Sequence, residues 1–228
     1  MKSFITFSGI ILAAFLLVGC ESTSGEETTS EPAAEQTAEA PAEAMEETAV
    51  VLNANLATED ELNGLGLSAD VVAQITEQRP FLTMNDFDAL LGDMETKEEL
   101  YASIFVPFNL NTTAEADFKM IPGVGDRMAH EFEEYRPYIS LEQFRREIGK
   151  YVDDAEVARY EKYVFVPVEL NSASEEAIKA LPGVGDRMAH EFEEYRPYTS
   201  MEQFRKEIGK YVDDKELVRL ERFVYLGQ

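Results

Sequence analysis

Two short glycine turns in this sequence can present backbone N–H groups to a ligand. Each has the sequence Pro-Gly-Val-Gly-Asp-Arg, and a new helix is expected to begin after its second glycine. The first N–H groups of a helix have no partner within the helix, and the positive end of the helix dipole favours an anion there. The pattern therefore predicts unpartnered backbone N–H groups at each helix start, with one arginine beside each turn. The candidate residues are Gly123, Gly125 and Arg127 in the first turn and Gly183, Gly185 and Arg187 in the second.

Other kinds of chemistry lack a complete set of residues. His130 and Glu131 begin like the zinc-binding motif His-Glu-X-X-His, but Glu134 stands where the second histidine is required. The glycine turns lack the strand and the lysine of a nucleotide-binding loop. No serine, histidine and aspartate follow a plausible catalytic order. We expect neither an enzyme nor a metal or cofactor site.

A duplicated segment positions the two turns. Residues Pro122–Tyr138 recur without a change at Pro182–Tyr198. A short apolar helical run precedes each copy, proline and glycine end that run, and a second helix follows. Apolar residues at i, i+1, i+4 and i+7 place one face of the second helix toward a core. In the first copy these are Met128, Ala129, Phe132 and Tyr135. The local prediction is two helices joined by a tight hairpin.

The chain from residue 50 onward contains three related units. Asn55, Asn111 and Asn171 begin similar segments at intervals of 56 and 60 residues, which indicates a repeat array. Each unit also holds a second, less regular hairpin, whose helices are expected to start after Ser200 and Asp213 in the last unit. We predict an all-α fold, without a sheet, in which every unit has four short helices. The units are expected at residues 50–106 (unit one), 107–166 (unit two) and 167–228 (unit three).

Local signals predict where the helices of a unit begin and end. Thr112 with Glu115, and Ser172 with Glu175, fit the capping box that starts a first helix. The apolar runs near positions 104, 164 and 223 are interpreted as the ends of fourth helices.

Unit one is a degenerate copy of the other two. Its turn has the sequence Gly-Leu-Gly-Leu-Ser, so the proline is absent and Ser68 replaces the second glycine. The unit carries 11 acidic residues and only two basic ones, Arg79 and Lys97. We predict that unit one keeps the fold, serves in packing or spacing, and does not bind anions through its turn.

The N-terminus has the pattern of a bacterial lipoprotein. Phe4–Val18 forms the apolar part of a signal peptide, and the Leu-Val-Gly-Cys pattern that ends at Cys20 matches a lipobox. We predict removal of residues 1–19 and acylation of Cys20, the only cysteine in the chain. Residues 20–49 contain nine glutamates and no lysine or arginine, a composition that predicts a disordered acidic tether. The expected location is the bacterial cell envelope, at the outer membrane or another outer or periplasmic face, with the lipid as the membrane contact.

The repeated turns resemble the helix-hairpin-helix (HhH) family. Ala129 and Ala189 complete its hairpin pattern Gly-X-Gly-X-X-X-Ala. The order of lipid anchor, acidic linker and tandem modules is similar to that of ComEA-type competence proteins, and the resemblance is good from about residue 107 onward. It implies that N–H groups near Gly123–Arg127 and Gly183–Arg187 bind phosphates of duplex DNA, without reading the base sequence.

The charge of the chain argues against DNA. The formal net charge is −25, whereas non-specific DNA affinity comes chiefly from basic residues that neutralise phosphates. Asp126 and Asp186 follow the second glycines, where a carboxylate can occupy the free N–H groups and repel a phosphate. More acid, including Glu131, Glu133 and Glu134, is expected on the exposed face of the next helix, and likewise in the second copy.

Basic residues are enriched only in the second hairpins. They form either a basic stripe or an ordinary mixed-charge helix face, which is the commoner case. They are Arg145, Arg146, Lys150, Arg205, Lys206, Lys210, Arg219 and Arg222. Two functions therefore remain open: a membrane-tethered module that binds duplex DNA, or a structural or adaptor module that binds an envelope protein.

Overall fold

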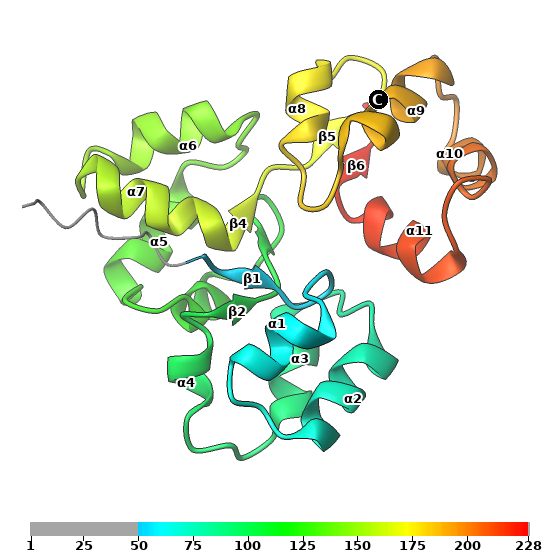
Figure 1. Ribbon diagram of the computed structural model, residues 1–228. Coiled ribbons are helices and arrows are strands. Elements are labelled where there is room, and N and C mark those ends of the chain that lie inside the picture. The colour runs from blue at the N-terminus through cyan, green and yellow to red at the C-terminus, as the bar shows by residue number, and fades with distance from the viewer. Residues whose placement is uncertain (1–49, 228) are drawn as a thin grey trace, which may run out of the picture. The chain divides into compact units, whose positions relative to one another are not determined.

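The computed structural model describes residues 50–227, and Figure 1 shows their helices and strands. The predicted signal peptide, the acylated Cys20 and the acidic tether lie outside the described residues. Among the described residues, none of the helices has the length and apolar character needed to span a bilayer.

Each unit contains two pairs of short helices, one pair for each predicted hairpin. In unit one these are α1 (Glu59–Gly64), α2 (Ala69–Gln78), α3 (Met84–Leu91) and α4 (Lys97–Leu100). In unit two they are the 3-10 helix η1 (Glu115–Met120), α5 (Asp126–Glu134), α6 (Leu141–Ile148) and α7 (Asp154–Tyr160), which continues as the 3-10 turn η2 (Glu161–Tyr163). In unit three they are α8 (Glu175–Lys179), α9 (Asp186–Glu194), α10 (Met201–Ile208) and α11 (Asp214–Glu221). The prediction of a helical fold with four short helices per unit is confirmed.

Short parallel strands close each unit, and here the prediction of no sheet was wrong. The apolar runs interpreted as helix ends form strands of two residues, each paired with the first residues of its own unit. The pairs are β1 (Leu52–Asn53) with β2 (Ile104–Phe105), β3 (Phe108–Asn109) with β4 (Val164–Phe165), and β5 (Val168–Glu169) with β6 (Val224–Tyr225). A partner more than 50 residues away along the chain leaves no local periodicity, so the sequence pattern could not indicate the pairing.

The first helices of units two and three begin two residues later than predicted. Their N-cap residues are Ala114 and Ser174, so the proposed capping boxes at Thr112 and Ser172 do not form. An acceptor earlier in the chain holds the predicted cap residues in a turn instead. In unit three the Glu169 carboxylate accepts hydrogen bonds from the Ser172 hydroxyl at 2.7 Å and from the Asn171 backbone N–H at 3.0 Å.

The predicted caps of the second hairpin in unit three are confirmed. The Ser200 hydroxyl accepts from the Gln203 N–H at 3.2 Å, and the Asp213 carboxylate accepts from the Glu216 N–H at 2.8 Å.

An asparagine and an arginine brace every unit in the same way. In unit three, Asn171 donates to the Tyr198 carbonyl at 2.9 Å and accepts from the Tyr198 N–H at 2.7 Å. Arg196 donates to the carbonyls of Leu170 and Ala173 at 2.6 and 2.7 Å. Asn55 and Arg79 repeat this arrangement in unit one, and Asn111 and Arg136 repeat it in unit two. Unit one has therefore kept the architecture of its neighbours.

Units one and two share one apolar core, whereas unit three has a core of its own. Phe105, at the end of unit one, lies edge-to-face against Phe108 at 5.1 Å and against Tyr163 at 5.0 Å, measured between ring centroids. Aromatic pairs of this geometry stabilise a core beyond the burial of their area. Unit one therefore packs against unit two, which is consistent with the predicted packing role.

Candidate functional site

The first hairpins of the three units share one backbone turn. Its first glycine has a positive φ angle in every unit: 75° at Gly66, 81° at Gly123 and 73° at Gly183. Residues with a side chain rarely adopt this angle, so the fold itself requires glycine at these positions. In units two and three the valine between the two glycines is buried and fixes the turn to the core.

The second glycine of the turn has no such structural reason to be glycine. Gly125 and Gly185 are the N-cap residues of α5 and α9, with φ angles of −95° and −90° that any residue adopts. A Cβ atom added at either position would meet nothing within 4 Å. The space in front of these helices is therefore open to solvent, and a ligand can approach the backbone closely.

The N-terminal amides of α5 and α9 have no cap. Neither helix has a side-chain cap, and the first backbone hydrogen bond into each is from Ala129 to Gly125 and from Ala189 to Gly185, both at 3.0 Å. Every other α-helix of eight residues or more between residues 50 and 227 has a side-chain cap, supplied by Ser68, Thr83, Ser140, Ser200 and Asp213. Among the helices of this length between residues 50 and 227, the two that follow the Gly-X-Gly turns thus lack a side-chain cap, and their free N–H groups form a candidate anion site.

The aspartates that follow these glycines point away from the amides, so the prediction that they occupy them was wrong. Asp126 pairs with Lys119 at 2.9 Å and Asp186 pairs with Lys179 at 2.8 Å, and both aspartate side chains are 89% exposed. The Lys179 ammonium lowers the pKa of the Asp186 carboxyl. Each lysine lies at the end of the helix before the turn, and this contact was missed because it joins two helices across the hairpin.

Arg127 and Arg187 are exposed and available. Neither forms an ion pair or a hydrogen bond within residues 50–227, and the Arg127 guanidinium lies 5.5 Å from the centre of the Tyr151 ring. They lie at the second helical position, beside the uncapped N–H groups. The structure thus places the predicted arginines together with the predicted glycines in each of the two hairpins.

The basic residues of the second hairpins are mostly engaged with carboxylates. Arg145 pairs with Glu161 at 2.5 Å and Arg146 with Glu147 at 2.9 Å, and Lys150 also pairs with Glu147. The counterparts Arg205, Lys206 and Lys210 pair with Glu221 and Glu207. The mixed-charge interpretation of these residues is supported, and they do not form a free basic stripe.

One prediction about the acidic face was wrong. Glu131 is half-buried and Glu191 is buried, with 9% of its surface exposed. These glutamates lie beside two hydrogen-bonded tyrosine pairs, in which the hydroxyls of Tyr135 and Tyr151, and of Tyr195 and Tyr211, are 2.7 Å apart. The face opposite the core is consequently less acidic than the sequence suggested.

Two arginines from the fourth helices lie against the turns, and sequence analysis missed this role. The Arg219 side chain is 2% exposed, pairs with Glu216 at 2.6 Å and donates to the Pro182 carbonyl at 2.6 Å. Its counterpart Arg159 pairs with Glu156 at 2.6 Å. A Cβ atom on Gly123 or Gly183 would lie 3.1 or 3.0 Å from the arginine. These arginines fix the position of the turn, and in the sequence they share the pattern Asp-Asp-X-Glu-X-X-Arg at a spacing of 60 residues.

Comparison with known proteins supports the interpretation of unit three. A family model of the helix-hairpin-helix motif matches residues 164–225, which extend from β4 to β6. Neither a curated protein nor a solved structure matches the chain. Unit three therefore contains an HhH motif, and unit two carries the same hairpin residue for residue from Pro122 to Tyr138.

Proposed function

We propose that the hairpins of units two and three bind the phosphate backbone of duplex DNA without sequence preference. HhH motifs generally serve in nucleic-acid binding. The observation that carries the proposal is the pair of uncapped helix N-termini at Gly125 and Gly185, each beside an arginine without a carboxylate partner. Backbone N–H groups at a helix start are suited to a phosphate, and two such sites contact two phosphates.

The proposal is compatible with the acidic composition because the negative charge is unevenly distributed. Unit one and residues 20–49 carry most of the excess acid, and the hairpin aspartates are neutralised in part by Lys119 and Lys179. With few phosphates neutralised, affinity should be modest and sensitive to salt. We expect a micromolar dissociation constant only below about 50 mM salt.

The test is a salt titration of the mature chain, residues 20–228, with two duplexes of unrelated sequence, monitored by fluorescence anisotropy. Equal binding of both duplexes and a log–log salt slope of about −2 to −4 are expected, for two to four phosphate contacts. Absence of binding at 20 mM salt would refute the proposal. A variant with Asp126→Lys and Asp186→Lys should bind more tightly than the wild type, because it adds positive charge beside both amide sites.

We further propose that the protein is tethered to a bacterial cell envelope membrane through a lipid on Cys20, in the manner of ComEA-type DNA uptake proteins. The lipobox pattern supports this tether. Cys20→Ser should abolish fatty-acid labelling and leave an unprocessed precursor. Normal labelling and processing of that variant would contradict the proposal.

A non-enzymatic adaptor role for an envelope protein partner is the second candidate. It is favoured by Ile139, a large apolar side chain that is 81% exposed next to a small hollow lined by Leu141, Val166 and Leu181. If the wild type fails to bind duplex DNA and the double lysine variant gains binding, the adaptor role is the better account.

A further inference from the structure

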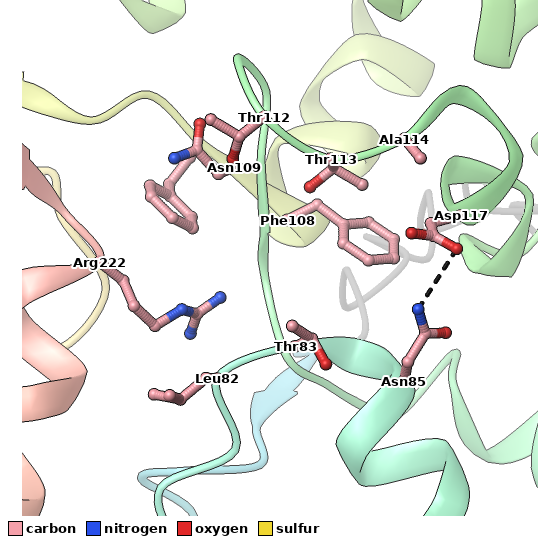
Figure 2. A pocket seen from close by; sticks show the side chains of 11 residues that line it. Leu82, Thr83, Asn85, Phe108, Asn109, Thr112, Thr113, Ala114, Asp117 and Arg222 are labelled. Carbon is pink, nitrogen blue, oxygen red and sulfur yellow. Dashed lines mark hydrogen bonds between the residues drawn. The ribbon is translucent and has the colours of Figure 1, made fainter.

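A cavity of about 440 Å³ is lined by residues of all three units. Figure 2 shows the Leu82–Thr83 segment of unit one on one side, Phe108 and Thr113 of unit two on another, and the Arg222 side chain of unit three extending into the space between them. Its volume lies in the range of small-molecule sites. The proposed DNA-binding residues do not line it.

The Arg222 guanidinium makes only long hydrogen bonds, and they go to backbone carbonyls. Its guanidinium donates to the Pro107 carbonyl at 3.1 Å and to the Phe81 carbonyl at 3.5 Å, and it lies 5.6 Å from the centre of the Phe165 ring. It forms no ion pair with a carboxylate of residues 50–227. Burial lowers the pKa of Arg222 to about 10. A guanidinium has five N–H donors, so most of its bonding capacity is left for a ligand.

Three other buried or partly buried arginines have much better partners. Arg159 and Arg219 each make two bonds of 2.6 to 2.7 Å to one glutamate. Arg79 has no carboxylate partner, but it donates to two carbonyls at 2.7 Å each. Arg222 alone among these four combines partial burial, long hydrogen bonds and an adjacent cavity. The planar Arg222 guanidinium thus lacks the carboxylate or phosphate that such a group normally binds through two N–H groups.

The other residues that line the cavity restrict the kind of anion that can bind beside Arg222. The rings of Phe108 and Phe165 and the Leu82 side chain are apolar, and the Thr112 and Thr113 hydroxyls add hydrogen-bonding groups. Asp117, which accepts from Asn85 at 3.3 Å, also lines the cavity. One arginine and one aspartate leave the cavity nearly neutral, so a second negative charge on a ligand would be repelled. We propose that this cavity binds a small organic monocarboxylate with an apolar body, held by Arg222.

The test uses phenylacetate as the probe, added to the ¹⁵N-labelled mature chain and followed by NMR. We expect saturable shifts of the Thr112 and Thr113 amides and of the Arg222 side-chain N–H, with a dissociation constant of about 0.1–1 mM. Phenylacetamide, the neutral counterpart, and inorganic phosphate should bind at least tenfold more weakly. Equal binding of phenylacetate and phenylacetamide, or no saturation by phenylacetate at 10 mM, would overturn the proposal.

Two variants separate the site from the fold. Arg222→Met should weaken phenylacetate binding at least tenfold, whereas Arg146→Met, which removes an exposed arginine elsewhere, should leave it unchanged. Leu82→Glu places a carboxylate of the protein beside Arg222, so it should block phenylacetate without loss of folding, which keeps the proposal testable if Arg222→Met unfolds. Unchanged affinity in both Arg222→Met and Leu82→Glu would overturn it.

Discussion

The hairpin of unit one and the hairpins of units two and three have the same backbone turn but different helix starts. Gly66 has the φ angle of Gly123 and Gly183, and the asparagine–arginine brace is present in every unit. In unit one, however, the Ser68 hydroxyl accepts from the Val71 N–H at 3.4 Å, and Asp70 stands where the other units have arginine. The fold and the proposed anion site thus depend on different residues, so a unit can keep the fold without the uncapped helix start.

The largest expected effect comes from giving units two and three the cap of unit one. The double variant Gly125→Ser and Gly185→Ser should lower duplex affinity about 1,000-fold, because each serine hydroxyl takes an N–H group that a phosphate would use. Stability should change by only a few tenths of a kcal/mol, because glycine and serine are both adequate N-caps. Anisotropy titration measures the affinity and thermal unfolding checks the fold.

The reverse exchange is the matched control. Ser68→Gly with Asp70→Arg opens the α2 terminus of unit one and should strengthen duplex binding several-fold, by adding a third site. If the double glycine-to-serine variant binds DNA as well as the wild type, the uncapped amides are not the binding groups.

The next largest effect is on stability, and it should be greater in unit three than in unit two. Arg219→Met removes a buried guanidinium from Glu216 and from the Pro182 carbonyl, and should destabilise unit three by about 3 kcal/mol. Arg159→Met should cost about 1 kcal/mol, because the Arg159 side chain is 30% exposed and solvent screens its ion pair. Urea unfolding of each variant measures the difference. Equal losses would mean that the two arginines support their turns to the same degree.

A smaller effect is expected from the exposed arginines. Arg127→Ala and Arg187→Ala should each weaken the binding of all duplex sequences by about threefold to fivefold and flatten the log–log salt slope by about one. Arg146→Ala is the control, since Arg146 already pairs with Glu147. A change in sequence preference would contradict a phosphate contact.

The smallest expected effect is on the pKa of His130, because the residues around the two identical hairpins differ. Glu115 lies 3.3 Å from His130 and raises the pKa of its imidazole, whereas the counterpart Glu175 pairs with Lys179 at 2.6 Å. This interaction stabilises the folded state below the ordinary histidine pKa, and the contribution is lost as pH rises through the raised value. Glu115→Gln should lower the pKa of His130 toward 6.5, as measured by NMR titration. An unchanged titration would exclude Glu115 as the cause.

Much of the fold could be predicted because the determining signals are local. Apolar residues at helical spacing, the Gly-X-Gly turn and the caps at Ser200 and Asp213 each act within a few residues. The strand pairs, and the contact of Lys119 with Asp126 across the hairpin, depend on residues that meet only after folding. The turn that holds the candidate glycines and arginines could therefore be predicted, and their role in binding stays a prediction, whereas the pairing of the aspartates required the structure.

The parallel pairing of the first and last residues in each unit also bears on how such a chain can change over generations. Because β5 pairs with β6, and β3 with β4, the chain enters and leaves each unit at neighbouring points, and only Val166 and Pro167 separate β4 from β5. An in-frame duplication of one unit therefore adds a segment whose first and last strands pair with each other. The points where the chain enters and leaves the neighbouring units stay in place. The identical segments Pro122–Tyr138 and Pro182–Tyr198 are what a duplication of this kind produces, and further copies would multiply the hairpins without a new fold.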